Sequence, residues 1–327
     1  MSQERGPLAG LRVVFFGMGG VFSRAPLEAL LRAGADLRAA VEPAPAETMA
    51  RVAEDEPFTK LEPSRWAASG AGRRGLPLAG AAGGTGQSMR DIAASAGAPL
   101  YSVRRLADAR TVAALAAYAP DAICVACFTR RLPPAVLALP RLGALNAHPS
   151  LLPENRGPDP LFWTFHAGAR KTGVTIHLMD EGLDTGPILA QRWMALVEGM
   201  PETSLEMVLG RLAGDLLVEA LAGLAAGTLT PRPQDEARAS YHSWPEAEDY
   251  VIPASWEARR AYTFAHGVMG RGIPITLMAR DGARFRLIEP LLYTLQSQMD
   301  EAWRVQHGLL VMTCADGDFI CRAEALG

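Results

Sequence analysis

An asparagine, a histidine and an aspartate between residues 143 and 186 have the types and spacing for acyl-transfer chemistry. Asn146 and His148 belong to an apolar run that Pro149 ends. Residues two apart in a strand point to the same face, so both side chains are expected at the carboxyl end of a strand, where open α/β sheets bind ligands. A second apolar run, 173–179, leads into an acidic, glycine-rich loop that contains Asp184. Two neighbouring strand ends would bring the three side chains together.

These three side chains fit an acyl transfer whose nucleophile arrives with the substrate. A histidine can take a proton from the nucleophile, while a carboxylate holds the histidine tautomer and stabilises the imidazolium. An asparagine amide can donate a hydrogen bond to the oxygen that becomes negative in a tetrahedral intermediate. No serine or cysteine stands between Asn146 and His148 to act as a nucleophile. The alternative is that two polar residues cap a strand and that Asp184 is an ordinary turn residue.

The wider segment resembles the folate-dependent formyltransferases, which include methionyl-tRNA formyltransferase, the sugar N-formyltransferases and formyltetrahydrofolate hydrolase. The family pattern is N-x-H-x-S-L-L-P, then R-G, G-V-T-I-H and D-x-G-x-D-T-G. The chain carries these motifs at 146–153, 156–157, 173–177 and 180–186. The resemblance implies that Asn146, His148 and Asp184 are catalytic, and that N10-formyltetrahydrofolate is the formyl donor.

The same resemblance implies residues that bind the donor and the acceptor. In the family, the turn at 128–133 and the loop at 180–182 line the pterin cleft, largely through backbone groups. The candidate donor-binding residues are Phe128, Thr129, Arg130, Leu132, Asp180, Glu181 and Gly182. The candidate substrate contacts are Gly17, Met18, Ser150, Arg156 and His177. Phe128 could equally be a core residue, and His177 could be a packing residue.

The four cysteines indicate neither a disulfide framework nor a metal site. Cys124 and Cys127 have C-x-x-C spacing, but they stand in the apolar run 122–128, which is typical of a buried strand. Three-residue spacing would place them on opposite faces of that strand. Cys314 and Cys321 stand in the C-terminal β region. We therefore expect no bound metal.

The composition is that of a soluble globular chain. Of 327 residues, 49% are hydrophobic and 20% are charged, which predicts one large domain or two ordinary ones. The sequence has no apolar run long enough to span a membrane, and its start lacks the basic-then-apolar layout of a signal peptide. We expect a cytoplasmic protein with no membrane partner.

The elements that must position the candidate residues begin with a β-α-β pattern. Apolar runs at 11–17 and 36–42 predict strands, and 26–34 predicts a helix. A dinucleotide fingerprint would need glycine where Phe22 stands, so NAD binding is not expected. Residues 43–99 form a proline- and glycine-rich insertion that either holds the acceptor or covers a sheet edge. We predict an α/β, Rossmann-like formyltransferase domain at 1–228.

A different pattern follows the helix expected at 205–227. Residues 229–245 form a proline-containing linker, and 246–327 contain a short helix near 256–267 and several short β runs. Asp281–Gly282 and Asp316–Gly317 are typical hairpin turns. We predict a smaller, mainly β domain that resembles the OB-like domain of methionyl-tRNA formyltransferase. Whether it touches substrate or forms a homo-oligomer is left open.

The charge distribution favours a small acceptor over a nucleic acid. Residues 229–327 carry ten arginines against thirteen acidic residues, and residues 1–228 are balanced. A protein that grips RNA needs a basic surface. We therefore expect a small-molecule amine as acceptor, such as an amino sugar, a nucleotide sugar or another biosynthetic amine. Methionyl-tRNA and plain hydrolysis of the formyl donor are the alternatives.

Overall fold

The computed structural model of the chain describes residues 6–45, 57–61, 87–297 and 299–326. Its strands are β1 (Arg12–Gly17), β2 (Asp36–Pro43), β3 (Phe58–Lys60), β4 (Leu100–Val103), β5 (Ala122–Ala126), β6 (Ala144–His148), β7 (Lys171–Leu178), β8 (Ile188–Ala195), β9 (Val251–Pro253), β10 (Thr276–Met278), β11 (Arg284–Tyr293), β12 (Trp303–Gln306), β13 (Leu309–Thr313) and β14 (Asp318–Leu326). Its α-helices are α1 (Val21–Arg32), α2 (Met89–Ser95), α3 (Ala109–Ala116), α4 (Pro134–Leu137), α5 (Pro160–His166), α6 (Glu202–Ala225) and α7 (Ala258–Val268). Short 3₁₀ turns lie at Glu236–Arg238, Ala247–Tyr250 and Met269–Arg271.

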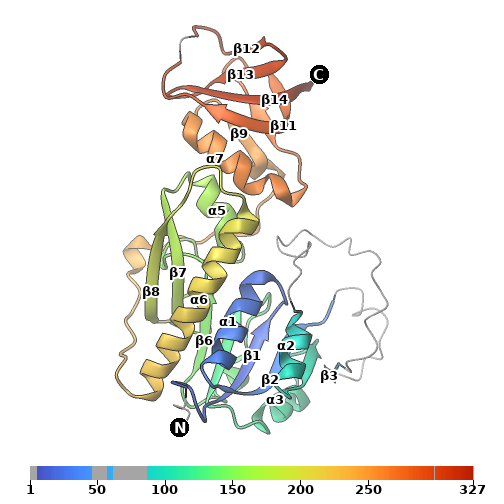
Figure 1. Ribbon diagram of the computed structural model, residues 1–327, viewed down its shortest axis with the longest axis vertical. Helices are drawn as coiled ribbons and strands as arrows, with labels where there is room; N and C mark the ends of the chain where they lie inside the picture. The colour runs from blue at the N-terminus through green and yellow to red at the C-terminus, as the bar shows by residue number, and fades with distance from the viewer. Residues whose placement is uncertain (1–5, 46–56, 62–86, 298, 327) are drawn as a thin grey trace, which may run out of the picture.

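The strands form two sheets that follow one another along the long axis of the molecule (Figure 1). The first has eight strands in the order β3-β4-β2-β1-β5-β6-β7-β8. Its centre is parallel, whereas β3, β7 and β8 pair antiparallel with their neighbours. The second has six strands in the order β12-β13-β14-β11-β10-β9, and only β9 and β10 pair in parallel. The prediction of an α/β first part and a smaller, mainly β second part is confirmed.

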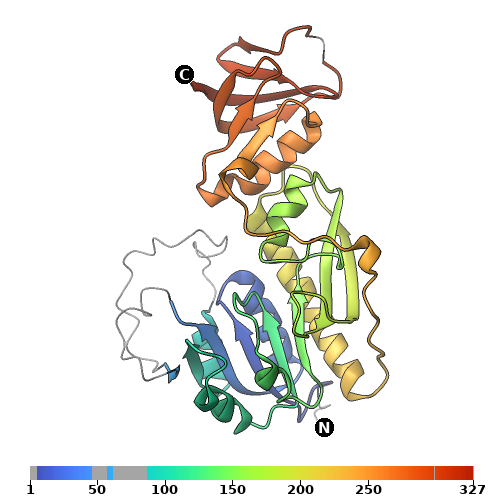
Figure 2. The ribbon, with the colours of Figure 1, turned by 180° about the vertical axis from the view of Figure 1, so that it is seen from behind.

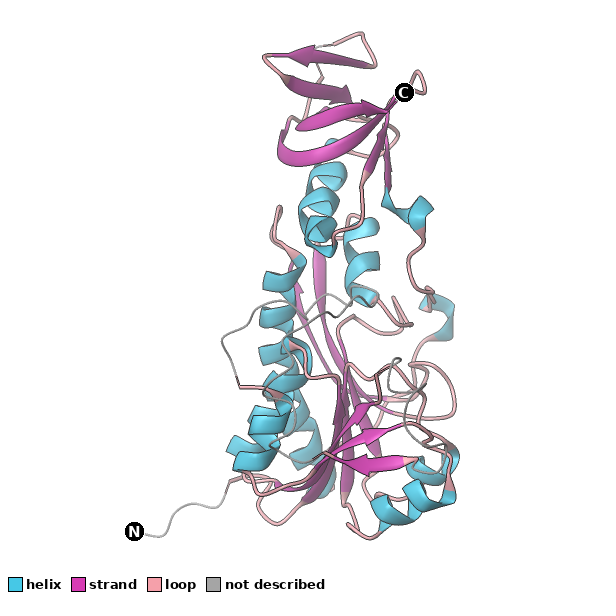
Figure 3. Ribbon diagram, turned by 90° about the vertical axis from the view of Figure 1, so that its right-hand side faces the viewer, coloured by secondary structure: helices cyan, strands magenta, loops and turns pink. Residues whose placement is uncertain are grey.

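Helices cover both faces of the first sheet, and Figure 3 shows them on its two sides. Alternate residues of β1 explain this arrangement: Val13 and Phe15 pack toward α1, α2 and α6, while Val14 and Phe16 pack toward α3 and α4. A strand that is apolar on both faces belongs in the middle of such a sandwich. The apolar residues on both faces of β1 therefore predict helices on both sides of the sheet.

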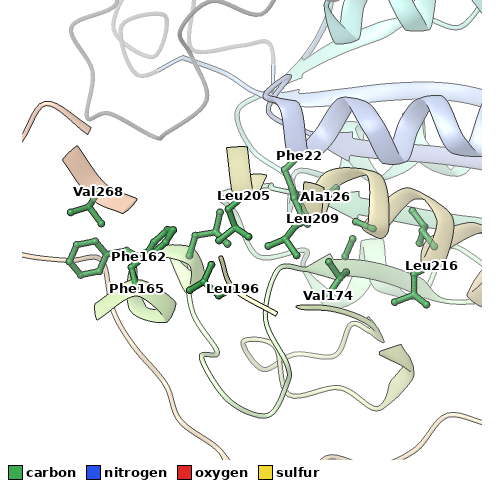
Figure 4. Packing of buried hydrophobic residues seen from close by; sticks show 14 of the residues in the cluster. Phe22, Ala126, Phe162, Phe165, Val174, Leu196, Leu205, Leu209, Leu216 and Val268 are labelled. Carbon is green, nitrogen blue, oxygen red and sulfur yellow. The ribbon is translucent and has the colours of Figure 1, made fainter. Parts of the chain in front are cut away.

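The helix α6 contributes many residues to the larger of the two buried apolar clusters. Its Leu205, Leu209 and Leu216 lie close to Phe22 of α1 and Val174 of β7 (Figure 4). The helix begins at Glu202, three residues before the predicted start, and ends close to the predicted end.

The same core continues into the C-terminal part. Figure 4 shows Val268 of α7 against Phe162 and Phe165 of α5, and the buried cluster runs on to Phe264 and Phe319. The helix α7 packs on the second sheet through β11 and β14. The two sheets therefore share one continuous apolar core.

Some predicted boundaries differ from the structure. The first helix begins at Val21 rather than Pro26, because the chain turns directly after Gly17. Much of the predicted insertion 43–99 lies outside the described residues. Within it, the structure describes the edge strand β3, paired with β4, and the helix α2, which Ser88 caps. The strands β8, β9 and β12 were not predicted, because their short or mixed patterns give no clear period.

Candidate active site

The strand β6 presents Asn146 and His148 on one face, as predicted. Leu145 and Ala147 alternate with them and face the α6 side. The neighbouring strand β7 runs antiparallel and places His177 directly opposite Asn146. Three polar side chains therefore gather on the face that α3 and α4 cover.

The loop between β7 and β8 brings Asp184 to this group by a different route from the one that the sequence predicts. Because β6 and β7 are antiparallel, their carboxyl ends lie at opposite edges of the sheet. Asp184 arrives because the loop folds back over the strand pair. Inside the loop, Asp180 accepts hydrogen bonds from the Gly182 amide at 3.0 Å and the Thr185 hydroxyl at 2.7 Å. Asp184 itself has a left-handed backbone, with φ 55°.

The Asp184 carboxylate is the centre of the assembled site. Its Oδ1 lies 3.6 Å from His148 Nδ1, 3.6 Å from His177 Nε2 and 3.4 Å from Asn146 Nδ2. Its Oδ2 accepts a hydrogen bond of 3.0 Å from the Gly157 amide. The structure thus brings together all three residues of the predicted trio, and it adds His177 as a fourth member.

The Asn146 amide is oriented by its neighbours. His177 Nδ1 lies 2.8 Å from the Leu178 carbonyl, which only accepts, so this nitrogen carries the hydrogen. His177 Nε2 is then free to accept from Asn146 Nδ2 at 3.1 Å. Since Asp184 Oδ1 accepts from the same amide group, the Asn146 nitrogen is turned toward the centre of the site.

The His148 ring is held by a backbone group that the sequence did not indicate. Its Nε2 donates to the Asn155 carbonyl at 2.9 Å, a closer contact than the one between Nδ1 and Asp184. Asn155 has a left-handed backbone with φ 57°, which points its carbonyl back at the ring. The tautomer is therefore set by Asn155, not by Asp184 as expected, and Nδ1 is the nitrogen left for proton exchange.

The electrostatics of the site favour an ionised Asp184. Its side chain is 14% exposed, and burial alone would raise the pKa of its carboxyl group. Interaction with His148, interaction with His177 and the hydrogen bond from the Gly157 amide outweigh burial and hold the pKa of the Asp184 carboxyl group well below its usual range. The site is thus a buried anion beside two imidazoles and an amide donor.

The predicted donor-binding segments border the same face of the sheet. Phe128 follows β5 and packs edge-on against Phe16, with ring centroids 5.2 Å apart. Phe128 and Met179, which precedes the 180–182 loop, pack against one apolar cluster, in which Leu132 is buried. Arg130 donates to the Arg104 carbonyl. Thr129, Asp180, Glu181 and Gly182 are at least partly exposed.

The candidate substrate contacts separate into two groups. Gly17 and Met18 lie at the carboxyl end of β1, where the Met18 amide donates to Ser23 Oγ at 3.1 Å. Ser150 is buried and donates to the Glu154 carbonyl at 2.7 Å. Arg156 is also buried, and its guanidinium group binds Gln234 and Glu236. The Ser150 and Arg156 side chains are therefore engaged within the protein.

The sequence suggested that both cysteines of the C-x-x-C motif lie in one strand, but the structure places only Cys124 in a strand. Cys124 is buried in β5, whereas Cys127 lies beyond the end of β5, is exposed and has φ 54°.

Within the described ranges, no three His, Cys, Asp or Glu side chains are grouped so as to hold a metal ion. In that same part of the chain, no helix has the length and apolar character needed to cross a membrane.

Comparison with known proteins identifies the family of this chain. Residues 77–221 match the formyl transferase family model. The methionyl-tRNA formyltransferase of Acidobacterium capsulatum is 37% identical over 213 residues, covering 65% of this chain and 68% of that protein. The corresponding enzyme of Anaeromyxobacter dehalogenans is 45% identical over 162 residues, covering 50% of this chain and 52% of that protein. The chain belongs to the formyltransferase family.

Solved structures show the same fold. An N-formyltransferase from Helicobacter canadensis, in complex with folinic acid and dTDP-3-aminofucose, aligns with a TM-score of 0.62 and 12% identity over 97% of this chain and all of that chain. HypX from Aquifex aeolicus aligns with a TM-score of 0.52 and 18% identity over 95% of this chain and 45% of that chain. At such identities the likeness concerns the fold alone. The sequence matches to the methionyl-tRNA formyltransferases named above span about half to two thirds of the length of those relatives.

Proposed function

We propose that the chain transfers the formyl group of N10-formyltetrahydrofolate to a primary amine in the cytoplasm. The contact of Asp184 Oδ1 with both Asn146 Nδ2 and His148 Nδ1 carries this proposal. It places a hydrogen-bond donor and a proton acceptor around one carboxylate, which is what formyl transfer to an amine requires. The half-buried Phe128 and the exposed residues 180–182 support a place for the pterin ring on the same face.

The proposed proton transfers follow from the orientation of each side chain. A primary amine is largely protonated near neutral pH and cannot attack until it loses a proton. His148 Nδ1 takes that proton, and Asp184 stabilises the imidazolium. The amine then forms a bond to the formyl carbon. The Asn146 Nδ2 hydrogen that points at Asp184 Oδ1 turns to the new negative oxygen, which the imidazolium also stabilises. The bond from the formyl carbon to N10 breaks, the second amine proton ends on N10, and His148 returns its proton to water.

A small amine is the acceptor that we propose first. Exposed arginines of the C-terminal sheet pair with acidic neighbours, as in Arg286 with Glu324 and Arg322 with Glu289 at 3.3 Å. Together with the net negative charge of residues 229–327, these pairs leave little basic surface for RNA.

Methionyl-tRNA is the second candidate acceptor, because the curated relatives named above are methionyl-tRNA formyltransferases. The family match covers 77–221, which is the part of the fold that holds the proposed trio. It supports the shared formyl donor more directly than it supports the acceptor.

Release of tetrahydrofolate from N10-formyltetrahydrofolate tests the proposal. Purified protein is incubated without acceptor, with methionyl-tRNA, and with a pool of amino sugars, nucleotide amino sugars and other amines. Release that depends on the amine pool would support a small acceptor, and splitting the pool would identify it. Release only with methionyl-tRNA would favour the second candidate. Equal release in all three arms would indicate a hydrolase, and no release in any arm would overturn formyl transfer.

A further inference from the structure

The segment between α6 and the second sheet returns along the first sheet. Figure 2 shows it passing beside β7 and β8 before it reaches the C-terminal part. We call residues 232–242 of this segment the strap. At its start, Arg232 and Ile188 exchange backbone hydrogen bonds of 2.7 and 2.8 Å. The sequence predicted only a linker here.

The strap binds the loop that holds His148. The Arg156 amide donates to the Ser240 carbonyl at 2.9 Å, and the His242 amide donates to the Arg156 carbonyl at 2.9 Å. Ser240 Oγ accepts from the Asn155 amide at 2.8 Å. Asn155 is the residue whose carbonyl fixes the His148 ring, so the strap fixes the backbone on which that carbonyl stands.

Gln234 of the strap binds the loop that carries Asp184. Its Nε2 donates to the Asp184 carbonyl and to the Gly186 carbonyl, both at 2.7 Å. Its Oε1 accepts from Arg156 Nη2 at 2.8 Å and from Arg156 Nε at 3.1 Å. One amide group therefore joins the two loops that supply the partners of His148, and both of its hydrogens are used.

The backbone needs such support at these positions. Asp184 and Asn155 are non-glycine residues with positive φ, a conformation that residues other than glycine adopt less readily. Gly157, whose amide binds Asp184, has φ 120°, and a Cβ there would lie 2.0 Å from the His242 carbonyl. The strap thus approaches the site as closely as the backbone allows.

We propose that the strap is a positioning element of the active site, and that Gln234 is the residue that holds Asp184 in register with His148. This inference rests on the proposed formyl transfer. Gln234 touches no reacting atom. It acts through the main chain of 184–186 and through Arg156, so its loss displaces the carboxylate without removing it.

Gln234→Glu isolates the donating role of the amide. The variant keeps the size of the side chain and an oxygen for Arg156, but it turns a second oxygen toward two carbonyls. The Arg156–Glu236 ion pair at 2.6 Å still anchors the strap, so the fold should survive. Gln306→Glu, the same change on the exposed strand β12, is the matched control.

Two measurements then test the inference. For Gln234→Glu we expect kcat to fall about 10- to 100-fold, with KM for both substrates within about twofold of the parent, because a small misplacement affects the chemical step. The pH profile of kcat should also shift, since Asp184 no longer faces His148 Nδ1 at its native distance. Gln306→Glu should match the parent in all of these.

Hydrogen exchange of the backbone amides provides a readout that needs no activity. Peptides covering 153–157 and 180–187 should exchange faster in Gln234→Glu than in the parent or in Gln306→Glu. Parental kcat and parental exchange in Gln234→Glu would overturn the inference, and so would a raised KM with unchanged exchange, since that would indicate ligand contact. If the parent itself transfers no formyl group, the proposed function fails, while the exchange data still decide whether Gln234 holds the loop.

Discussion

Two buried ionic clusters in the described part of the chain differ in the partners of their charged groups. One is the candidate site, where Asp184 lies beside His148, His177 and Asn146. The other joins the two parts of the chain, where Arg271, just after α7, lies between Asp159 at the start of α5 and Glu202 at the start of α6. Both are nearly closed to solvent, since Arg271 and Glu202 are each 5% exposed and His148 is likewise 5% exposed.

In the Arg271 cluster, the guanidinium group donates hydrogen bonds to both carboxylates. It makes two bonds to Asp159, at 2.5 and 2.8 Å, and two to Glu202, of which the Nε bond is 2.7 Å. Burial opposes the charge, but the hydrogen bonds to both carboxylates outweigh it and raise the pKa of Arg271 above its usual range. Because a guanidinium group keeps its proton, we assign this cluster a structural role, which is to join the starts of α5 and α6.

The Asp184 cluster is held more loosely. Its contacts with the two imidazoles are 3.6 Å long, and its partners are two histidines and an amide group in place of a guanidinium group. Burial and charge pairing alone therefore do not separate a candidate catalytic cluster from a structural one. The two clusters differ in the type of basic residue and in the length of its contacts.

Removing the charge at Asp184 should produce the largest effect. Asp184→Asn keeps the size of the side chain but no longer stabilises the imidazolium, so we expect the rate of formyl transfer to fall about 10³- to 10⁴-fold. Steady-state kinetics with the identified acceptor measure this. Asp215→Asn, on an exposed turn of α6, is the control and should retain parental rates. A loss of less than tenfold in Asp184→Asn would remove the distinction drawn between the clusters.

Truncating the Arg271 side chain should lower the stability of the fold and leave the rate of formyl transfer nearly unchanged. Arg271→Ala leaves two buried carboxylates unpaired, so we expect the free energy of unfolding to fall by about 3–5 kcal/mol. Urea unfolding followed by tryptophan fluorescence measures this. The folded fraction should keep a kcat within about threefold of the parent.

The matched control for that change is an exposed pair. Arg322→Ala breaks the ion pair with Glu289, whose side chain is 50% exposed, and should cost at most about 1 kcal/mol. Equal losses in the two variants would mean that the Arg271 cluster adds nothing beyond a surface contact.

Removing the amide donor should have the next largest effect. Asn146→Ala deletes the group proposed to stabilise the negative oxygen, so we expect kcat to fall about 10²- to 10³-fold with little change in KM. Single-turnover measurements separate this step from product release. Near-parental turnover in Asn146→Ala would sink the oxyanion assignment and leave this amide a structural partner of His177.

Glu206 sharpens the comparison because, among the residues that the structure describes, no cation is bonded to this buried carboxyl group. Glu206 lies one turn after Glu202, is 5% exposed and accepts a long hydrogen bond of 3.4 Å from the Phe22 amide. Burial, the largest cause, raises its pKa to about 7. A carboxyl group whose pKa is raised on folding stabilises the native state less as the pH rises from its unfolded pKa toward the folded one.

Glu206→Gln should therefore stabilise the protein in a pH-dependent way. At pH 5 the variant and the parent should differ little. At pH 8 the variant should be more stable by up to about 3 kcal/mol, because the parent must ionise a buried group while glutamine can still accept from Phe22. Urea unfolding at the two pH values measures this, and a difference that is the same at both would contradict the prediction.

The sequence predicted those parts of the site that depend on side-chain type and on short spacing. Asn146 and His148 are two residues apart in one strand, and the glycine and acidic residues of the D-x-G-x-D-T-G loop predict a turn. Both motifs could therefore be recognised directly. The two-faced burial of β1 likewise follows from a short apolar run.

The parts that were missed depend on backbone groups and on long-range pairing. The Asn155 carbonyl and the Gly157 amide have no sequence signature beyond a turn of Asn-Arg-Gly, in which residues tolerant of positive φ occur together. Gln234 meets Asp184 across 50 residues, and nothing near either residue indicates the other. The direction of β7 was also missed, because an apolar run does not say which way its strand is paired.

The continuous core has a consequence for the way this chain can be divided. Phe162, Phe165 and Leu205 of the first part are covered by α7 and its neighbours in the second, and Arg271 closes the same joint. A fragment cut after α6 would expose this aromatic face and two uncompensated carboxylates to water, and it would also lack the strap. The C-terminal part is therefore not an interchangeable module: a chimera that replaced it with a domain from another family member would need to bring its own cover for α5 and its own hold on the Asp184 loop.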